Sequence, residues 1–121
     1  MRLKKLKPVF SIGKLASLEG VDAGKPFVFT AATDEEVSLV CPKELMPADA
    51  LAVSDGWRGF RITGVLDFSL TGILAKISAV LAEAEVGIFA VSTFNTDYIF
   101  VKEENFVRGI SALETAGYEI I

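Results

Sequence analysis

Polar residues near the C-terminus have the types and the spacing to hold a small charged ligand. Residues 92–97 read STFNTD and separate two apolar stretches, so they should connect two strands. The hydroxyl groups of Thr93 and Thr96 can donate and accept hydrogen bonds, and the carboxylate of Asp97 can bind a cation. Asn95 and Asp97 are also residue types that close turns by bonding to the backbone. The segment is therefore either an ordinary turn or one wall of a ligand site.

A second candidate lies at residues 66–74, LDFSLTGIL, which should end a strand and open a helix. The first N–H groups of a helix have no partner inside it, and this end carries partial positive charge. Gly72 has no side chain, so a small anion such as a carboxylate can approach the backbone closely. The alternative is that Gly72 only allows the helix to pack on the sheet, with Ser69 or Thr71 as its cap.

The two candidate segments complement each other in charge. In a split βαβ arrangement, the strand before residue 66 lies beside the strand that begins at Asp97, so both segments lie near each other. Asp97 would bind a cationic group while the helix start binds an anion a few ångströms away. An α-amino acid carries both groups on one carbon, so it is the ligand that these segments favour.

The sequence lacks the usual catalytic and metal-binding patterns. It contains no histidine and a single cysteine, Cys41, so it offers neither the commonest proton shuttle nor a zinc site. No GxxxxGK[ST], GxGxxG or GxSxG motif is present. Cys41 lies in the apolar run VSLVC, which predicts a buried thiol and a reducing, cytoplasmic environment. We therefore expect no enzymatic activity, no metal and no cofactor.

Composition narrows the range of partners. The chain has 121 residues, is 51% hydrophobic and carries a net charge of −4. This acidic balance argues against nucleic acid as a partner, and no apolar stretch is long enough to cross a bilayer. The cations Arg2, Lys4, Lys5 and Lys7 near the start suggest a solvated tail or a basic arm. The high apolar content suits a chain that also buries surface against a second copy, so we expect a homodimer.

Periodicity predicts the elements of the second half. Residues 59–65 and 86–92 should be strands around a helix over 72–84, which should stop near Gly87. Residues 97–101 should form a central strand, followed by a helix from Glu103 that Gly117 caps and by a last strand over 118–121. The order strand, helix, strand, strand, helix, strand is that of an α+β, ferredoxin-like βαββαβ fold.

The first half repeats this order weakly. It offers a strand over 8–15 and a hairpin with an acidic turn whose second strand is VSLVC. The stretch VSLVCPKEL is similar in pattern to YIFVKEENF, so we predict a degenerate internal repeat in which a loop, residues 17–25, replaces the first helix. Pro42 and Pro47 should keep any helix between them very short. The predicted units are residues 1–56 and 57–121, with the first sharing or extending the sheet of the second.

The second half also resembles the ACT domain family. The stretches that carry the resemblance are LDFSLTGIL, IFAVSTFNTDYIFV and the terminal ALETAGYEI. They are similar to small bacterial ACT proteins, to CASTOR-type arginine sensors and to the regulatory domains of aspartate kinases. The resemblance covers residues 57–121 well and the first half more loosely, as a diverged ACT-like unit.

The resemblance implies a non-catalytic regulatory protein that binds an amino acid between two ACT units. Carried over by position, it nominates the following ligand-binding residues: Leu70, Thr71, Gly72, Ile73, Thr93, Phe94, Thr96 and Asp97. Many ACT domains have Asp-x-Pro-Gly in this loop, whereas Thr71 precedes Gly72 here and the loop is longer, so the identity of the ligand does not transfer. Arginine or lysine would suit Asp97. The alternative function is a ligand-free interaction or dimerisation module.

Overall fold

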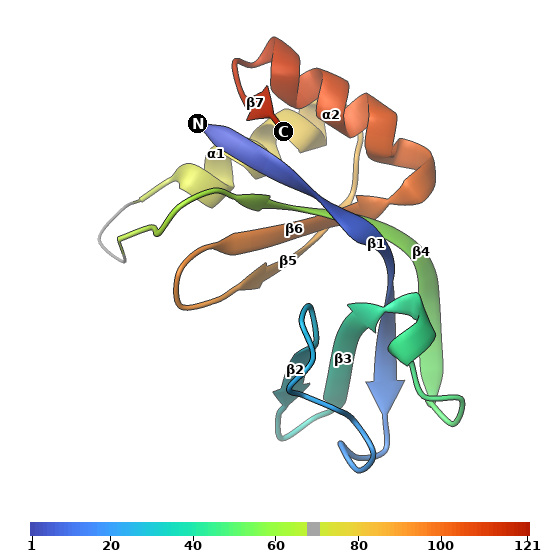
Figure 1. Cartoon of the computed structure of the whole chain (residues 1–121). Helices are drawn as coiled ribbons and strands as arrows, with labels where there is room; N and C mark the ends of the chain where they lie inside the picture. The colour runs from blue at the N-terminus through green and yellow to red at the C-terminus, as the bar shows by residue number, and fades with distance from the viewer. Residues whose placement is uncertain (68–70) are drawn as a thin grey trace. The chain divides into compact units, whose positions relative to one another are not determined.

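The computed structural model describes residues 1–67 and 71–121 and divides the chain into two compact units (Figure 1). The C-terminal unit consists of residues 1–7 and 58–121, and the N-terminal unit of residues 8–57. Two long strands, β1 (Arg2–Leu15) and β4 (Ala52–Ile62), contribute to both units. The division thus falls after Trp57, and residues 1–7 join the C-terminal unit rather than the N-terminal one.

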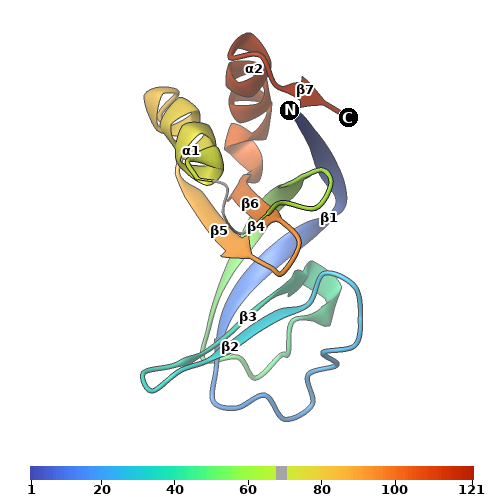
Figure 2. The same ribbon diagram turned by 90° about the vertical axis from the view of Figure 1, so that its left-hand side faces the viewer.

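The C-terminal unit has the predicted order of elements. After β4 come α1 (Ile73–Glu83), β5 (Ile88–Ser92), β6 (Asp97–Lys102), the short 3₁₀ turn η2 (Glu103–Asn105), α2 (Phe106–Thr115) and β7 (Glu119–Ile120). Its strands follow the order β7-β1-β4-β6-β5, so β6 is central, as predicted. Both helices lie on one face of this sheet, as Figure 2 shows from a second side. The ferredoxin-like fold is confirmed.

The core of the C-terminal unit lies between the two helices and the sheet. Apolar residues at every second position of β4 and β6 face the helices, and α1 buries its predicted apolar stripe against them. Fully buried members of this core are Phe60, Ile62, Ile77, Leu81, Ile99 and Leu113. A Cβ atom on Gly109 of α2 would lie 3.3 Å from Leu81 Cδ2, so α2 passes close to α1 at this point.

Both helices end with the same hydrogen-bond pattern, but only one uses the predicted glycine. The Tyr118 N–H donates to Leu113 O across Gly117, which has a φ of 102°. At the end of α1, the Val86 N–H donates to Leu81 O, and the left-handed residue is Glu85, with a φ of 60°. Helix α1 thus ends within one residue of the predicted Ala84, and Glu85 rather than a glycine takes the left-handed position beyond it.

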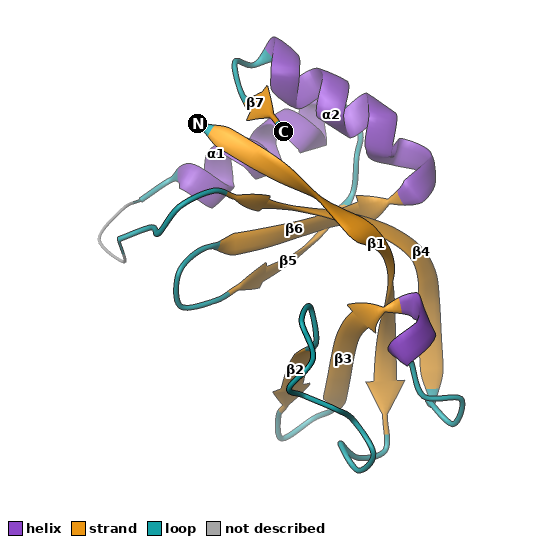
Figure 3. Cartoon of the chain, viewed as in Figure 1, coloured by secondary structure: helices purple, strands orange, loops and turns teal. Residues whose placement is uncertain are grey.

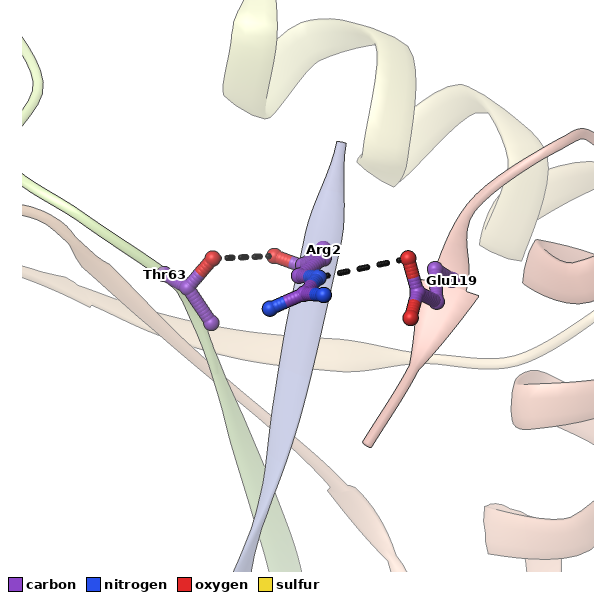
Figure 4. A network of polar contacts seen from close by, with 3 residues as sticks. All are labelled: Arg2, Thr63 and Glu119. Atoms are coloured by element: carbon purple, nitrogen blue, oxygen red, sulfur yellow. Dashed lines mark hydrogen bonds and ion pairs between the residues drawn. The ribbon is translucent and has the colours of Figure 1, made fainter.

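The first residues of the chain form a strand rather than the predicted solvated tail. Leu3 is fully buried, and Arg2 and Leu3 pair in parallel with Glu119 and Ile120 of β7. Arg2 Nε donates to Glu119 Oε2 at 3.2 Å, and Thr63 Oγ1 donates to Arg2 O at 3.3 Å (Figure 4). The start of β1 therefore lies between β4 and β7.

The N-terminal unit is mostly strand. It contains β2 (Phe29–Ala32), β3 (Val37–Pro42), the second half of β1 and the start of β4, in the order β2-β3-β1-β4. A 3₁₀ turn, η1 (Lys43–Leu45), follows β3 and is as short as the flanking prolines predict. Residues 16–28 form a loop, drawn in teal between β1 and β2 in Figure 3.

The hairpins of the two units share one register. Ala32 pairs with Val37 beside the turn of the first hairpin, and Ser92 pairs with Asp97 beside the turn of the second. Each residue of the second pair lies 60 positions after its counterpart in the first. Each hairpin is followed directly by a 3₁₀ turn. That the N-terminal unit is a diverged copy of an ACT unit stays a prediction, which this shared register supports.

Cys41 is fully buried in the N-terminal unit, as predicted. Removal from water, with a smaller contribution from the nearby Glu44 carboxylate, raises the pKa of the Cys41 thiol to about 11. The thiol is therefore protonated at neutral pH and unreactive. Among the described residues, no helix is long and apolar enough to span a membrane.

Candidate functional site

The segment from Ser92 to Asp97 is a tight turn whose hydroxyl groups are largely used for structure. The backbone N–H and Oγ1 of Thr93 donate to Thr96 O at 2.8 and 2.9 Å. Thr96 is only 7% exposed, and its Oγ1 donates to Ile62 O at 2.7 Å. These bonds close the turn and anchor it to β4. The hydroxyl protons of both threonines are thus directed at backbone carbonyls, while Asp97 accepts one from Ser92 at 2.6 Å.

The loop after β4 lies against this turn. The backbone N–H of Leu66 donates to Asn95 O at 2.7 Å. Together with the bond from Thr96 to Ile62, this contact brings the end of β4 to the beginning of β6. The prediction that the two candidate segments lie close together is therefore confirmed, because β4 and β6 are neighbours in the sheet.

Gly72 is the cap residue at the start of α1, and it adopts a left-handed conformation with a φ of 79°. The first helical bond runs from Lys76 N to Gly72 O at 2.9 Å. Among the described residues, no side chain caps this helix end, so the predicted capping role of Thr71 is wrong, and Ser69 lies outside the described residues. The N–H groups of Ile73, Leu74 and Ala75 precede the first intrahelical donor and remain available to a ligand.

A cavity of about 330 Å³ lies between the helix start and the turn. We call it the corner cavity. Its lining residues are Leu66, Asp67, Gly72, Ile73, Leu74, Ala75, Ser92, Thr93, Phe94, Asn95, Thr96 and Asp97. The first residues of α1 form one part of this lining, and the turn forms the other.

Six of the eight predicted ligand residues line the corner cavity. They are Gly72, Ile73, Thr93, Phe94, Thr96 and Asp97. Thr71 lines an adjoining hollow of about 210 Å³, which shares Gly72 and Ile73 with the corner cavity and also includes Met1, Lys76 and Tyr118. Leu70 lies outside the described residues. That the six residues bind a ligand stays a prediction.

The sequence analysis missed Asp67, a second carboxylate in the lining of the cavity. Its signal was present, because Asp67 is the single acidic residue of the segment LDFSLTGIL. With Asp97 on the turn, the cavity carries two carboxylates, and no Lys or Arg is among its described lining residues. The described residues also include no cluster of three or more metal-binding side chains.

Phe94 occupies the tip of the turn and is 79% exposed. The Phe94 ring therefore does not pack in the core of this chain, and it lines the rim of the corner cavity. Phe89, by contrast, is half-buried and lies edge-on to Phe100, with ring centroids 6.4 Å apart. The aromatic residues near the turn thus divide between packing and the rim.

Comparisons with known proteins agree with this fold. The model of the ACT domain family matches residues 52–115. The mouse (Mus musculus) protein named cytosolic arginine sensor for mTORC1 subunit 1 is 32% identical over 112 residues, which cover 86% of this chain and 34% of that protein. This chain thus spans about a third of the length of the curated relatives it matches.

Two solved structures are similar over nearly the whole chain. A crystal structure of a protein from Agobacterium tumefaciens has a TM-score of 0.87 and 32% identity. The match covers 99% of this chain and 91% of that protein chain. The ligand-free regulatory subunit of aspartate kinase from Thermus thermophilus has a TM-score of 0.66 and 12% identity. The match covers 97% of this chain and 98% of that subunit. The second likeness is one of fold alone.

Proposed function

Because the chain belongs to the ACT domain family, we propose that it is a non-catalytic regulatory protein that binds an amino acid in the corner cavity. The observation that carries this proposal is the pairing of free helix N–H groups with two carboxylates around one cavity. A volume of about 330 Å³ lies at the lower end of the range for small-molecule sites and suits a ligand the size of one amino acid.

In this proposal, each charged group of the ligand has a partner. The α-carboxylate accepts hydrogen bonds from the N–H groups of Ile73, Leu74 and Ala75, where the helix dipole favours a negative charge. The α-ammonium binds one of the two carboxylates, Asp67 or Asp97. The other carboxylate would attract a cationic side chain, so we propose arginine or lysine as the ligand. The name of the mouse relative, an arginine sensor, supports arginine.

We further propose that the protein works as a cytoplasmic homodimer. The apolar side chains of Phe94 and Val65 are 79% and 74% exposed, although both belong to the region around the corner cavity. A second copy that covered them would also close the cavity against water. Ligand binding would then change the assembly of the protein, which is one way for a regulatory module to transmit a signal.

Isothermal titration of the pure protein against the twenty amino acids tests the proposed ligand site. Arginine or lysine should bind with one site per chain. Asp97→Asn and Asp67→Asn should each weaken that affinity about 10- to 100-fold, since a charge-assisted hydrogen bond contributes roughly 1.5–3 kcal/mol. Asp34→Asn is the matched control, because Asp34 is an exposed aspartate in the equivalent turn of the N-terminal unit. An affinity unchanged in both site variants would refute the assignment.

The second candidate function is a dimerisation or docking module without a ligand. The 80% exposure of Val107 on α2, which is not among the described lining residues of the corner cavity, favours it. Sedimentation of the protein with and without arginine separates the two functions. An amino-acid-dependent change in association supports the sensor, whereas stable association and no binding heat from any amino acid support the docking module.

A further inference from the structure

The N-terminal unit contains a cavity of about 200 Å³ beneath the loop of residues 16–28. We call it the loop cavity. Leu39 and Cys41 of β3 form its floor, Val28 and Leu45 lie at its sides, and Asp22 and Lys25 of the loop also line it. The floor is fully buried, whereas the two charged residues are exposed. The loop cavity is thus a hollow with half-buried Val28 and Leu45 at its sides and two charged residues at its mouth, above a base of fully buried apolar residues.

The predicted internal repeat would account for this space. Leu39 and Cys41 stand at the positions that Ile99 and Val101 occupy 60 residues later. In the C-terminal unit, α1 covers these positions by packing Ile77 and other apolar side chains on them. In the N-terminal unit, a loop replaces the helix and supplies fewer apolar side chains. The volume that a helix would fill is therefore left for another molecule.

The mouth of the loop cavity offers one charge of each sign. The Gly24 N–H donates to Asp22 Oδ1 at 3.1 Å, which orients the carboxylate and leaves Oδ2 for a ligand. Lys25 follows in the same turn, its N–H donating to Asp22 O at 3.4 Å. The Lys25 ammonium forms no ion pair with any residue that the structure describes. Since the Cys41 thiol is protonated, the floor adds no charge.

We propose that the loop cavity is a second binding site, which takes a small aliphatic carboxylate and, in particular, an aliphatic α-amino acid. The carboxylate of the ligand binds the Lys25 ammonium, and its α-ammonium binds Asp22. Its side chain lies among Val28, Leu39 and Leu45. The cavity is smaller than the 300–1,000 Å³ of drug-sized sites, so the ligand is limited to a few carbon atoms. This site is separate from the corner cavity and does not depend on the function proposed for it.

Titration calorimetry of the whole chain with three related molecules tests the chemistry of the site. L-Leucine carries both charged groups, 4-methylpentanoate lacks the ammonium, and isoamylamine lacks the carboxylate. We expect saturable binding of leucine at one site per chain, weaker binding of 4-methylpentanoate and the weakest binding of isoamylamine. Equal affinities of leucine and 4-methylpentanoate would support the site but assign it to simple carboxylic acids. Saturable binding of neither carboxylate at millimolar concentration would overturn the proposal.

Variants locate the binding. Lys25→Ala should weaken leucine binding about tenfold or more, because it removes a charged partner at the mouth. Lys43→Ala is the matched control, since Lys43 is an exposed lysine of the same unit outside the cavity lining. Val28→Phe should fill the cavity and abolish binding. Circular dichroism checks that the Val28→Phe variant folds. If it does not fold, the loss of leucine affinity in Lys25→Ala, a change at an exposed position, tests the site.

Asp97→Asn distinguishes the loop cavity from the corner cavity. It should leave leucine binding unchanged while it weakens arginine binding. If leucine binding is lost in Asp97→Asn and retained in Lys25→Ala, the leucine site is the corner cavity and the proposal is wrong. Loss of arginine binding alone in Asp97→Asn would leave the loop cavity supported and would also support the proposed function.

Discussion

The polar residues of the turn differ in role. The two threonines use their hydroxyl groups to hold the turn together, whereas the carboxylate of Asp97 can accept further hydrogen bonds from a ligand in the corner cavity. Thr93 and Thr96 direct their hydroxyl protons at backbone carbonyls, so their main role is to hold the turn in place. The carboxylate of Asp97 accepts one hydrogen bond, at Oδ1, from Ser92, and it also lines the cavity. The two explanations first considered for this segment, a turn and a ligand site, thus apply to different residues within it.

Thr96→Val tests the structural role of the turn. The substitution removes the hydroxyl that donates to Ile62 O in a buried position. We expect the free energy of unfolding to fall by about 1–3 kcal/mol, the usual cost of a buried polar group that loses its partner. Urea denaturation measures it. Thr30→Val, at an exposed strand position, should change stability by less than about 0.5 kcal/mol. Equal effects in the two variants would contradict the anchoring role of Thr96.

Gly72→Ala tests the conformation of the helix start. A side chain there would meet no atom within 4 Å, but a φ of 79° is unfavourable for any residue with a Cβ atom. We expect a loss of about 1–2 kcal/mol in stability, together with weaker amino-acid binding. Gly87→Ala is the control, because Gly87 also has open space and has no left-handed φ. Thermal unfolding compares the two, and a stable Gly72→Ala protein with full affinity would count against this site.

Among the elements, the two helix ends show how packing can impose a conformation that the residue type disfavours. Both ends carry the same bond from the second residue beyond the helix cap, but one has Gly117 at the left-handed position and the other has Glu85. The side chain at this position does not determine the motif. At both ends the acceptor residue, Leu81 or Leu113, is fully buried, and the donor residue, Val86 or Tyr118, is at least half-buried.

Glu85→Gly should therefore stabilise the protein. Glycine adopts the left-handed conformation without steric cost, so we expect a gain of up to about 1 kcal/mol in the free energy of unfolding. The reverse change, Gly117→Ala, should lose about as much. Guanidinium denaturation of both variants measures the pair, and a destabilised Glu85→Gly protein would show that the Glu85 side chain itself stabilises the end of α1.

The first strand is the element whose importance the sequence least suggested. Leu3 is fully buried in the core of the C-terminal unit, so Leu3→Ala should cost about 2–5 kcal/mol. Lys4→Ala, one residue later and exposed, should cost less than about 0.5 kcal/mol. Chemical denaturation followed by circular dichroism distinguishes the two. A mild effect of Leu3→Ala would mean that residues 1–7 are dispensable for the fold.

At the scale of the whole molecule, each unit carries a cavity of its own, so the two proposed ligands should act on different segments. Hydrogen exchange measured by mass spectrometry should show that arginine slows exchange in residues 71–76 and 92–97, around the corner cavity. Leucine should slow exchange in residues 20–28, above the loop cavity. Ligand binding lowers the rate of local opening wherever it holds the backbone. The same protected segments with both ligands would show that they share one site.

The sequence by itself determined the local elements of this protein and the general place of its candidate site. The apolar spacing of α1, the hairpin around residues 92–97 and the glycine at position 72 are local patterns, and each is fixed by periodicity or backbone conformation. The similar pattern of VSLVCPKEL and YIFVKEENF was also visible in the sequence, which predicted a helix from Glu103, whereas the structure has a 3₁₀ turn over Glu103–Asn105 and begins α2 at Phe106.

Only the tertiary structure decided what depends on contacts between distant segments. Pairing of Arg2 with Glu119 made a strand of residues that looked like a basic tail. The neighbouring positions of β4 and β6 brought Asp67 into the same cavity as Asp97, and they gave the Thr96 hydroxyl a backbone partner 34 residues away. The loop cavity likewise arises from the packing of a loop on a strand. Such contacts are set by burial and hydrogen bonding across the fold, which no local pattern of residues encodes.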